Sequence, residues 1–113
     1  MKILYRNQAR EYSNSPNCSG FEFNLGVKDI DGAVVSVAGR YPEVGQVVNE
    51  ECREIAYVIE GKGQVVIEEK LFNIQSEDLI VIDKGERFYW EGTFKLFIYC
   101  TPAWSHEQHK QVR

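Results

Sequence analysis

Glu54 is the residue of this chain best placed for proton chemistry, because it opens an apolar run that closes on Gly61 and Gly63. A carboxyl group buried beside aromatic rings acquires a raised pKa and can then exchange a proton near neutral pH. A carboxylate at the same place can instead be a structural acceptor of hydrogen bonds from the backbone, from Arg53 or from Arg87. The sequence leaves both interpretations of Glu54 open.

Two further groups of side chains are of types that bind metals. Glu50, Cys52 and Glu54 are spaced two residues apart, so one face of a strand would carry two carboxylates and a thiol. We favour the simpler interpretation that Glu50 lies in a solvated bend before the strand. His106 and His109 are one helical turn apart, but two histidines without a third ligand are a weak metal signal. We interpret both as part of an exposed C-terminal tail.

Short apolar runs recur along the chain, whereas no long helical period is present. Phe21, Phe23 and Leu25 alternate with polar residues, which is the period of a strand. Many short strands at close spacing predict an all-β sandwich or barrel. The expected strands cover residues 3–5, 21–25, 33–38, 46–49, 54–60, 64–68, 71–74, 78–82, 87–90 and 95–101.

Three connecting segments complete this prediction. Residues 11–20 are polar and rich in turn formers, so we expect a loop there. Residues 61–63, Gly-Lys-Gly, are expected to link two strands as a short hairpin. Ser105 could cap a helix over 105–112.

The length of 113 residues predicts a single domain, 1–113. We expect the core of this domain at about 21–101 and a short helical tail at 102–113.

Composition excludes some classes of partner. The formal net charge is −4 and the pI is about 5.2, so no broad basic surface is offered to nucleic acid or to an anionic membrane. No run approaches the ~18 apolar residues of a membrane span. The chain has three cysteines, Cys18, Cys52 and Cys100, and no CxxC motif. This odd number argues against a disulfide framework. We therefore expect reduced thiols and a cytoplasmic protein.

Two segments together resemble the paired motifs of the cupins, small β-barrels whose usual pocket holds a metal on histidines. In EIAYVIEGKG, residues 54–63, Glu54 and Gly61 match the glutamate and glycine of the first motif with the expected gap. Gly85, after the apolar strand DLIVI, matches the glycine of the second. The resemblance spans about 33–101 and implies a cupin-type double-stranded β-helix, or jelly-roll barrel.

The chain departs from the cupin pattern where the metal ligands would be. The histidine pair of the first motif is replaced here by Val47 and Asn49, or by Val48 and Glu50, depending on the gap chosen. In the second motif, Asp83 stands in place of the proline, Phe88 in place of the histidine and Gly92 in place of the asparagine. Glu54 alone supplies one oxygen ligand, which cannot hold a transition metal against water. We therefore predict that the barrel has no metal and no cofactor.

The resemblance also implies a pocket inside the barrel, lined by Asn49, Glu54, Phe88, Trp90 and Tyr99, with Glu54 as the candidate catalytic residue. Apolar walls with a few polar groups are typical of small-molecule sites. Trp104, in the tail, is expected to lie outside this pocket, and Cys100 is expected to be a buried apolar residue.

Three functions are compatible with these residues. The favoured one is a metal-free barrel that binds a small organic, sugar-like ligand. The second is a metal-independent isomerase or epimerase of a sugar-type substrate, in which Glu54 works with Tyr57 or Tyr99. The third is a structural or interaction protein whose barrel is filled by its own aromatic side chains. Fold resemblance does not choose among them.

We also expect a homodimer. If the glutamate of the apolar run faces the interior, Ile55, Tyr57 and Ile59 face outward, because side chains alternate along a strand. Three large apolar groups on one outer face usually mark an interface. The alternative is that the C-terminal segment, with Trp104, folds back over this face.

Overall fold

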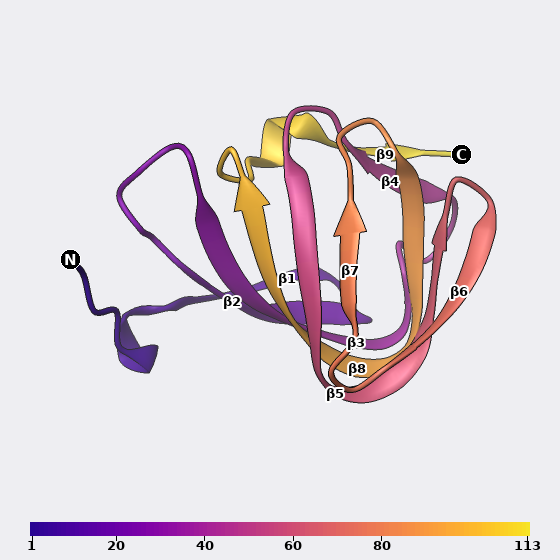
Figure 1. The fold of residues 1–113 in the computed structure, drawn as a ribbon, viewed down its shortest axis with the longest axis horizontal. Helices are drawn as coiled ribbons and strands as arrows, with labels where there is room; N and C mark the ends of the chain where they lie inside the picture. The colour runs from indigo at the N-terminus through magenta and orange to yellow at the C-terminus, as the bar shows by residue number, and fades with distance from the viewer.

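The chain consists almost entirely of β-strands in the computed structural model, which describes residues 1–113 (Figure 1). The elements are η1 (Arg6–Gln8), β1 (Arg10–Ser15), β2 (Cys18–Phe23), β3 (Asp31–Tyr41), β4 (Gln46–Asn49), β5 (Arg53–Ile67), β6 (Lys70–Gln75), β7 (Leu79–Ile82), β8 (Arg87–Thr101), η2 (His106–Gln108) and β9 (His109–Val112), where η denotes a 3-10 turn. The predicted all-β class is confirmed.

All strands belong to one antiparallel sheet that curls into a barrel (Figure 1). β8 is its central strand: β3 and then β4 pair with one edge of β8, and β5 pairs with the other. Beyond β5 lie β6 and β7, beyond β3 lie β2 and β1, and beyond β4 lies β9. The apolar side chains of alternate positions, such as Val58 on β5 and Leu96 on β8, fill the inside of the curl.

The long strands bend where glycines face one another. Gly92 of β8 pairs with Gly39 of β3 and with Gly63 of β5. A Cβ atom on Gly92 would lie 2.6 Å from the Cα of Gly63, so only glycine permits the backbones to approach this closely. The predicted hairpin at 61–63 is wrong, because β5 passes through these residues without reversing and stays paired with β8 throughout.

The N-terminal prediction also needs correction. The loop expected at 11–20 is instead part of the hairpin of β1 and β2, and no strand forms at 3–5. The hairpin is polar because it lies at the edge of the sheet, where few of its side chains are buried. Cys18 and Tyr12 are the residues that it contributes to the packed interior.

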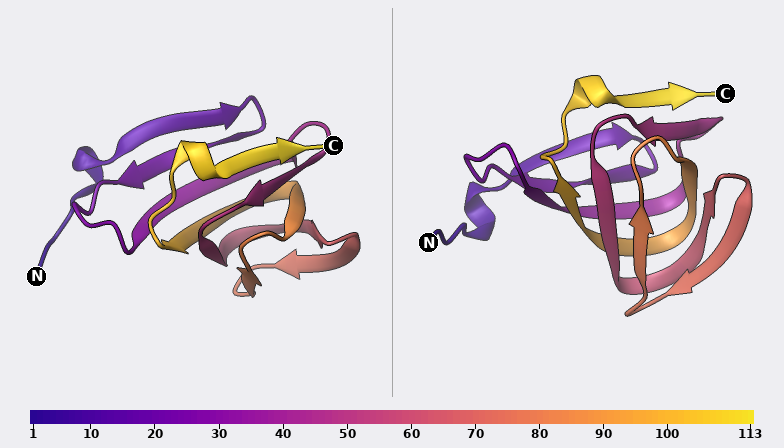
Figure 2. Two further views of the ribbon diagram at one scale, coloured as in Figure 1. Left: turned by 90° about the horizontal axis from the view of Figure 1, so that it is seen from above. Right: turned by 45° about the horizontal axis from the view of Figure 1, so that its top comes forward.

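The C-terminal segment is a 3-10 turn and a strand, not the predicted helix. The side chain of Ser105 makes no capping hydrogen bond, and β9 pairs with β4 from Asn49↔His109 to Gln46↔Val112. The edge of β4 that does not pair with β8 offers free backbone N–H and C=O groups, and β9 forms hydrogen bonds with them. A short helix on its own would lack such partners. Figure 2 shows the segment lying along the rim of the barrel.

The outer face of the sheet carries an exposed apolar patch. Tyr57, Ile59, Leu79, Val81 and Phe97 are all exposed, as the alternation along the strands predicts. The C-terminal segment does not cover this patch, because β9 is paired with β4 at another part of the sheet. All three cysteines are free and buried. No helix has the length and apolar character needed to cross a membrane.

Candidate functional site

A cavity of about 400 Å³ lies inside the barrel, and 10 of its 18 lining residues are hydrophobic. This volume falls in the range of roughly 300–1,000 Å³ that is usual for small-molecule sites. The aromatic and titratable side chains that line the cavity are Tyr12, Tyr41, Phe88, Trp90, Trp104, Glu54, Asp31, Arg10, Glu22, Cys18, Cys100, His106 and His109.

Three of the predicted site residues line this one cavity. Glu54 lies in the first part of β5, where the side chains of Glu54, Ala56 and Val58 are buried in alternation. Phe88 and Trp90 lie on β8, and their rings meet edge to face with centroids 6.1 Å apart. Their part in binding a ligand remains a prediction.

The other site predictions require changes. Tyr99 does not line the cavity: Ile98 and Cys100, its neighbours on β8, do so, and alternation therefore turns Tyr99 to the outer face. Asn49 lies behind the wall, where it is buried and hydrogen-bonded to Glu54. Trp104 is part of the wall rather than outside the pocket.

The carboxyl group of Glu54 is held by one protein partner. Asn49 Nδ2 donates to Glu54 Oε1 at 3.1 Å, whereas Arg53 pairs with Asp83 instead. The other carboxyl oxygen of Glu54, Oε2, has no hydrogen-bond partner in the protein. Because every fully buried side-chain oxygen has a partner, Oε2 is not fully buried and is reachable from the cavity that Glu54 lines. Burial raises the pKa of Glu54 to about 7, and the negative charge of Asp31 adds to this effect, while the Asn49 hydrogen bond opposes it. Glu54 can therefore accept or release a proton near neutral pH.

His109 enters the site, so the prediction of an exposed tail is wrong for this residue. The ladder between β9 and β4 sets His109 opposite Asn49. The Nδ1 atom of His109 lies 2.7 Å from Asn49 Oδ1, and its Nε2 lies 2.9 Å from the hydroxyl of Tyr41. The ring also packs against Trp104, with centroids 5.3 Å apart. Burial lowers the pKa of His109 to about 4, with a smaller contribution from His106, so the ring is neutral at physiological pH.

Tyr41 and Cys18 complete the titratable wall. Burial raises the pKa of the Tyr41 phenol well above its usual range, so its hydroxyl stays protonated. Burial likewise raises the pKa of the Cys18 thiol to about 12, which makes it a poor nucleophile. Of Glu54, His109, Tyr41 and Cys18, only Glu54 can therefore exchange a proton near neutral pH.

The structure brings no three His, Cys, Asp or Glu side chains together in a way that could hold a metal ion. Glu50 is exposed on a bend, as predicted, whereas Cys52 is buried and gives its backbone N–H to Gln108. The Glu50, Cys52 and Glu54 set is therefore not assembled as a site. That the barrel binds no metal remains a prediction from the donor types.

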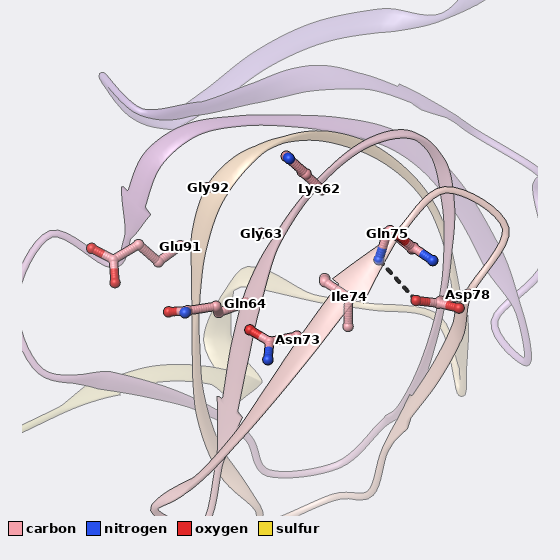
Figure 3. Close-up of a pocket in the computed structure, with 9 residues that line it drawn as sticks. All are labelled: Lys62, Gly63, Gln64, Asn73, Ile74, Gln75, Asp78, Glu91 and Gly92. Atoms are coloured by element: carbon pink, nitrogen blue, oxygen red, sulfur yellow. Dashed lines mark hydrogen bonds between the residues drawn. The ribbon is translucent and has the colours of Figure 1, made fainter.

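A second hollow, of about 640 Å³, lies over β5, β6 and β8 (Figure 3). Ile74 is the one hydrophobic residue among its nine, and its lining includes the exposed side chains of Lys62, Asn73 and Gln75. The dashed line in Figure 3 joins the Gln75 backbone N–H to Asp78, a turn contact of 2.8 Å. Because this hollow lacks buried polar groups aimed into it, the barrel cavity is the candidate site.

Comparison with known proteins identifies the fold. No protein-family model and no curated protein sequence matches the chain. A variant of Streptomyces Pac13 solved with uridine has a TM-score of 0.89 at 18% identity, covering 100% of this chain and 92% of that one. Pac13 is described as a nucleoside dehydratase.

Two other solved structures are similar. KdgF from Halomonas sp. has a TM-score of 0.73 at 14% identity, with 95% of this chain and 97% of that chain covered. Salicylate 1,2-dioxygenase from Pseudoaminobacter salicylatoxidans has a TM-score of 0.68 at 16% identity, with 79% of this chain and 26% of that chain covered. At these identities the likeness shows the fold alone, and the fold of this chain is that of the cupins.

Proposed function

We propose that this chain is a metal-free cupin-like barrel that binds a small, polar organic molecule of sugar or nucleoside size. The observation that carries the proposal is the cavity itself: about 400 Å³, with apolar walls and with Glu54, Tyr41 and His109 among its polar groups. Aromatic faces such as those of Trp90 and Trp104 suit the apolar face of a sugar ring or a flat base. The carboxyl group of Glu54 and the phenol of Tyr41 supply hydrogen bonds that the hydroxyl groups of a ligand need.

The cavity also argues against the interpretation of a filled barrel. Phe88 and Trp90 pack against the wall and leave the volume open, although both are buried. The similarity to Pac13, which has been solved with uridine, supports a nucleoside as the first probe.

Tryptophan fluorescence offers a direct test, because both tryptophans of the chain line the cavity. Trp90→Phe and Trp104→Phe variants each leave one reporter. We expect uridine, or its parts ribose and uracil, to change the emission of both variants in a saturable manner. Unchanged emission of both variants with all three compounds at millimolar concentration would count against this ligand class.

A second candidate function, acid/base catalysis on such a ligand, is favoured by one observation. The pKa of Glu54 is raised to about 7 by burial, which is the range that a general base or acid needs. Tyr57 and Tyr99, the partners considered from the sequence, lie outside the cavity, whereas Tyr41 and Tyr12 line it. The reaction class is the isomerisation or epimerisation of a sugar-type substrate, with removal of a proton next to a carbonyl group.

Proton exchange in D₂O tests this catalytic role. An enzyme of this class replaces a carbon-bound proton of its substrate with deuterium, which removes the corresponding ¹H NMR signal. We expect exchange in a keto-sugar with the wild type and none with Glu54→Gln. Equal exchange with the two proteins would exclude Glu54 as the base.

A further inference from the structure

The polar groups behind the cavity form a hydrogen-bond chain whose direction is set by the backbone. The backbone N–H groups of Glu51 and Cys52 both donate to Gln108 Oε1, at 3.0 and 3.3 Å. A backbone N–H can only donate, so the oxygen of the Gln108 amide must face these two groups. The amide nitrogen of Gln108 consequently faces the other way, toward Asn49.

This orientation fixes the next amide. Gln108 Nε2 donates to Asn49 Oδ1 at 3.2 Å, so the oxygen of Asn49 is on the side of Gln108. The nitrogen of Asn49 then donates to Glu54 Oε1 at 3.1 Å. A carboxylate oxygen is an acceptor, so both ends of the Asn49 amide are matched in polarity.

The same Asn49 oxygen determines the tautomer of His109. His109 Nδ1 lies 2.7 Å from Asn49 Oδ1, which has no proton to give, so Nδ1 must carry a hydrogen and donate it. A neutral imidazole has one N–H, which leaves a lone pair on Nε2. The Tyr41 hydroxyl, 2.9 Å from Nε2, is therefore the donor in that hydrogen bond.

We propose that His109 is a positioning residue that is locked in its Nδ1–H tautomer and that holds the hydroxyl proton of Tyr41 away from the ligand. Tyr41 lines the cavity, and its phenol oxygen then offers only lone pairs to a ligand that reaches it. Tyr41 selects ligands that present an O–H or N–H donor, such as a sugar hydroxyl or an imide, and disfavours a bare carbonyl oxygen. This selectivity rests on the proposed function, because it needs a ligand in the cavity.

The surroundings of His109 support a neutral ring. Tyr41, Asn49 and Trp104 contact the ring, His106 is close enough to affect its charge, and Asn49 lies between the ring and Glu54. Burial disfavours the imidazolium form, which lowers the pKa of His109 to about 4.

Nitrogen-15 NMR of histidine-labelled protein tests the tautomer without any ligand. At about pH 7 we expect His109 Nδ1 to resonate as a protonated nitrogen and Nε2 as an unprotonated one. His106, which has no hydrogen bond of this kind, provides an internal reference. A protonated Nε2 with an unprotonated Nδ1 in the wild type would overturn the inference.

A variant pair tests the cause. Asn49→Leu keeps a side chain of similar size but removes the acceptor, so His109 should shift toward the Nε2–H form. Lys110→Ala, at an exposed position of the same strand, is the control and should leave the tautomer unchanged. An unchanged tautomer in a folded Asn49→Leu protein would show that Asn49 does not set it; the wild-type spectrum decides the main point even if this variant does not fold.

The ligand arm uses uridine and four analogues, N3-methyluridine and the 2′-, 3′- and 5′-deoxyuridines, each of which lacks one of the four donors of uridine. Tyr41→Phe should weaken uridine binding about five- to tenfold, the usual effect of losing one hydrogen bond. The analogue that lacks the donor meeting Tyr41 should bind wild type and Tyr41→Phe equally. If Tyr41→Phe weakens the binding of every analogue by the same factor as the binding of uridine, Tyr41 does not select a donor. Failure of uridine to bind the wild type counts against the proposed ligand class, while the tautomer is still decided by NMR.

Discussion

Replacing Glu54 with glutamine is expected to stabilise the folded protein at alkaline pH and to leave its stability nearly unchanged at acidic pH. Burial raises the pKa of Glu54 from 4.5 to about 7, so the folded state holds this proton more tightly than the unfolded state. Stability therefore falls as the pH rises from about 4.5 to 7. At roughly 1.36 kcal/mol per pH unit, the full effect above the folded pKa is about 3 kcal/mol. Below the unfolded pKa the group is protonated in both states, and the penalty vanishes.

Glutamine carries no charge at any of these pH values, and its oxygen can still accept the hydrogen bond from Asn49. Urea unfolding of the two proteins between about pH 4 and 8 measures the difference. With a typical slope of about 1–3 kcal/mol per molar urea, Glu54→Gln should unfold at a midpoint at least ~1 M higher at alkaline pH and near the wild-type midpoint at acidic pH. Glu50→Gln, at an exposed position, is the control and should produce no such divergence. A gap that does not change with pH, or a variant that is less stable at about pH 8, would show that the buried charge of Glu54 does not destabilise the folded protein.

Gly92→Ala should lower the free energy of unfolding by at least ~2 kcal/mol, because the new Cβ would lie 2.6 Å from the Cα of Gly63. Gly85→Ala is the control and should lower it less, because a Cβ there meets nothing within 4 Å. Thermal unfolding compares the two variants. We propose that the exposed patch around Tyr57 is the interface of a homodimer, so light scattering at micromolar concentration should give about twice 13.1 kDa, and Tyr57→Glu should shift the mass toward that of the monomer. A wild type that is already monomeric would exclude this interface. Elemental analysis of tag-free protein should find well under one equivalent of iron, nickel, manganese or zinc, and a stoichiometric metal that disappears in Glu54→Gln would contradict the prediction of a metal-free barrel.

The sequence predicts the inside and outside of the strands well because alternation is local. Once Glu54 is placed inside, Tyr57 and Ile59 follow on the outer face, as the structure confirms. The resemblance, and not alternation, placed Tyr99 in the pocket, and with 87–90 and 95–101 expected as separate strands alternation could not be carried from Trp90 to Tyr99. In the continuous β8, Phe88 and Trp90 have the parity of Cys100, and Tyr99 has the opposite one.

What the sequence does not predict depends on contacts between distant residues. The glycines at 61 and 63 have the pattern of a turn, and their role in a bent, unbroken strand appears only when Gly92 is paired with Gly63. The polar hairpin of β1 and β2 is a strand pair because the edge of β3 offers partners for its backbone. His109 reaches the site because β9 pairs with β4, where His109 lies opposite Asn49, 60 positions earlier. The four residues of β9 show no alternation that could reveal this strand in the sequence.

Native mass spectrometry tests most directly whether the barrel holds a small polar molecule. Freshly purified protein is measured as isolated and after addition of uridine, together with Ala33→Phe, which fills the cavity wall, and Ala38→Phe, which adds the same ring at an exposed position of β3. We expect one bound small molecule per chain in the wild type and in Ala38→Phe, and none in a folded Ala33→Phe. Bare protein in every sample, or equal binding by Ala33→Phe, would contradict the assignment of the cavity as a ligand site.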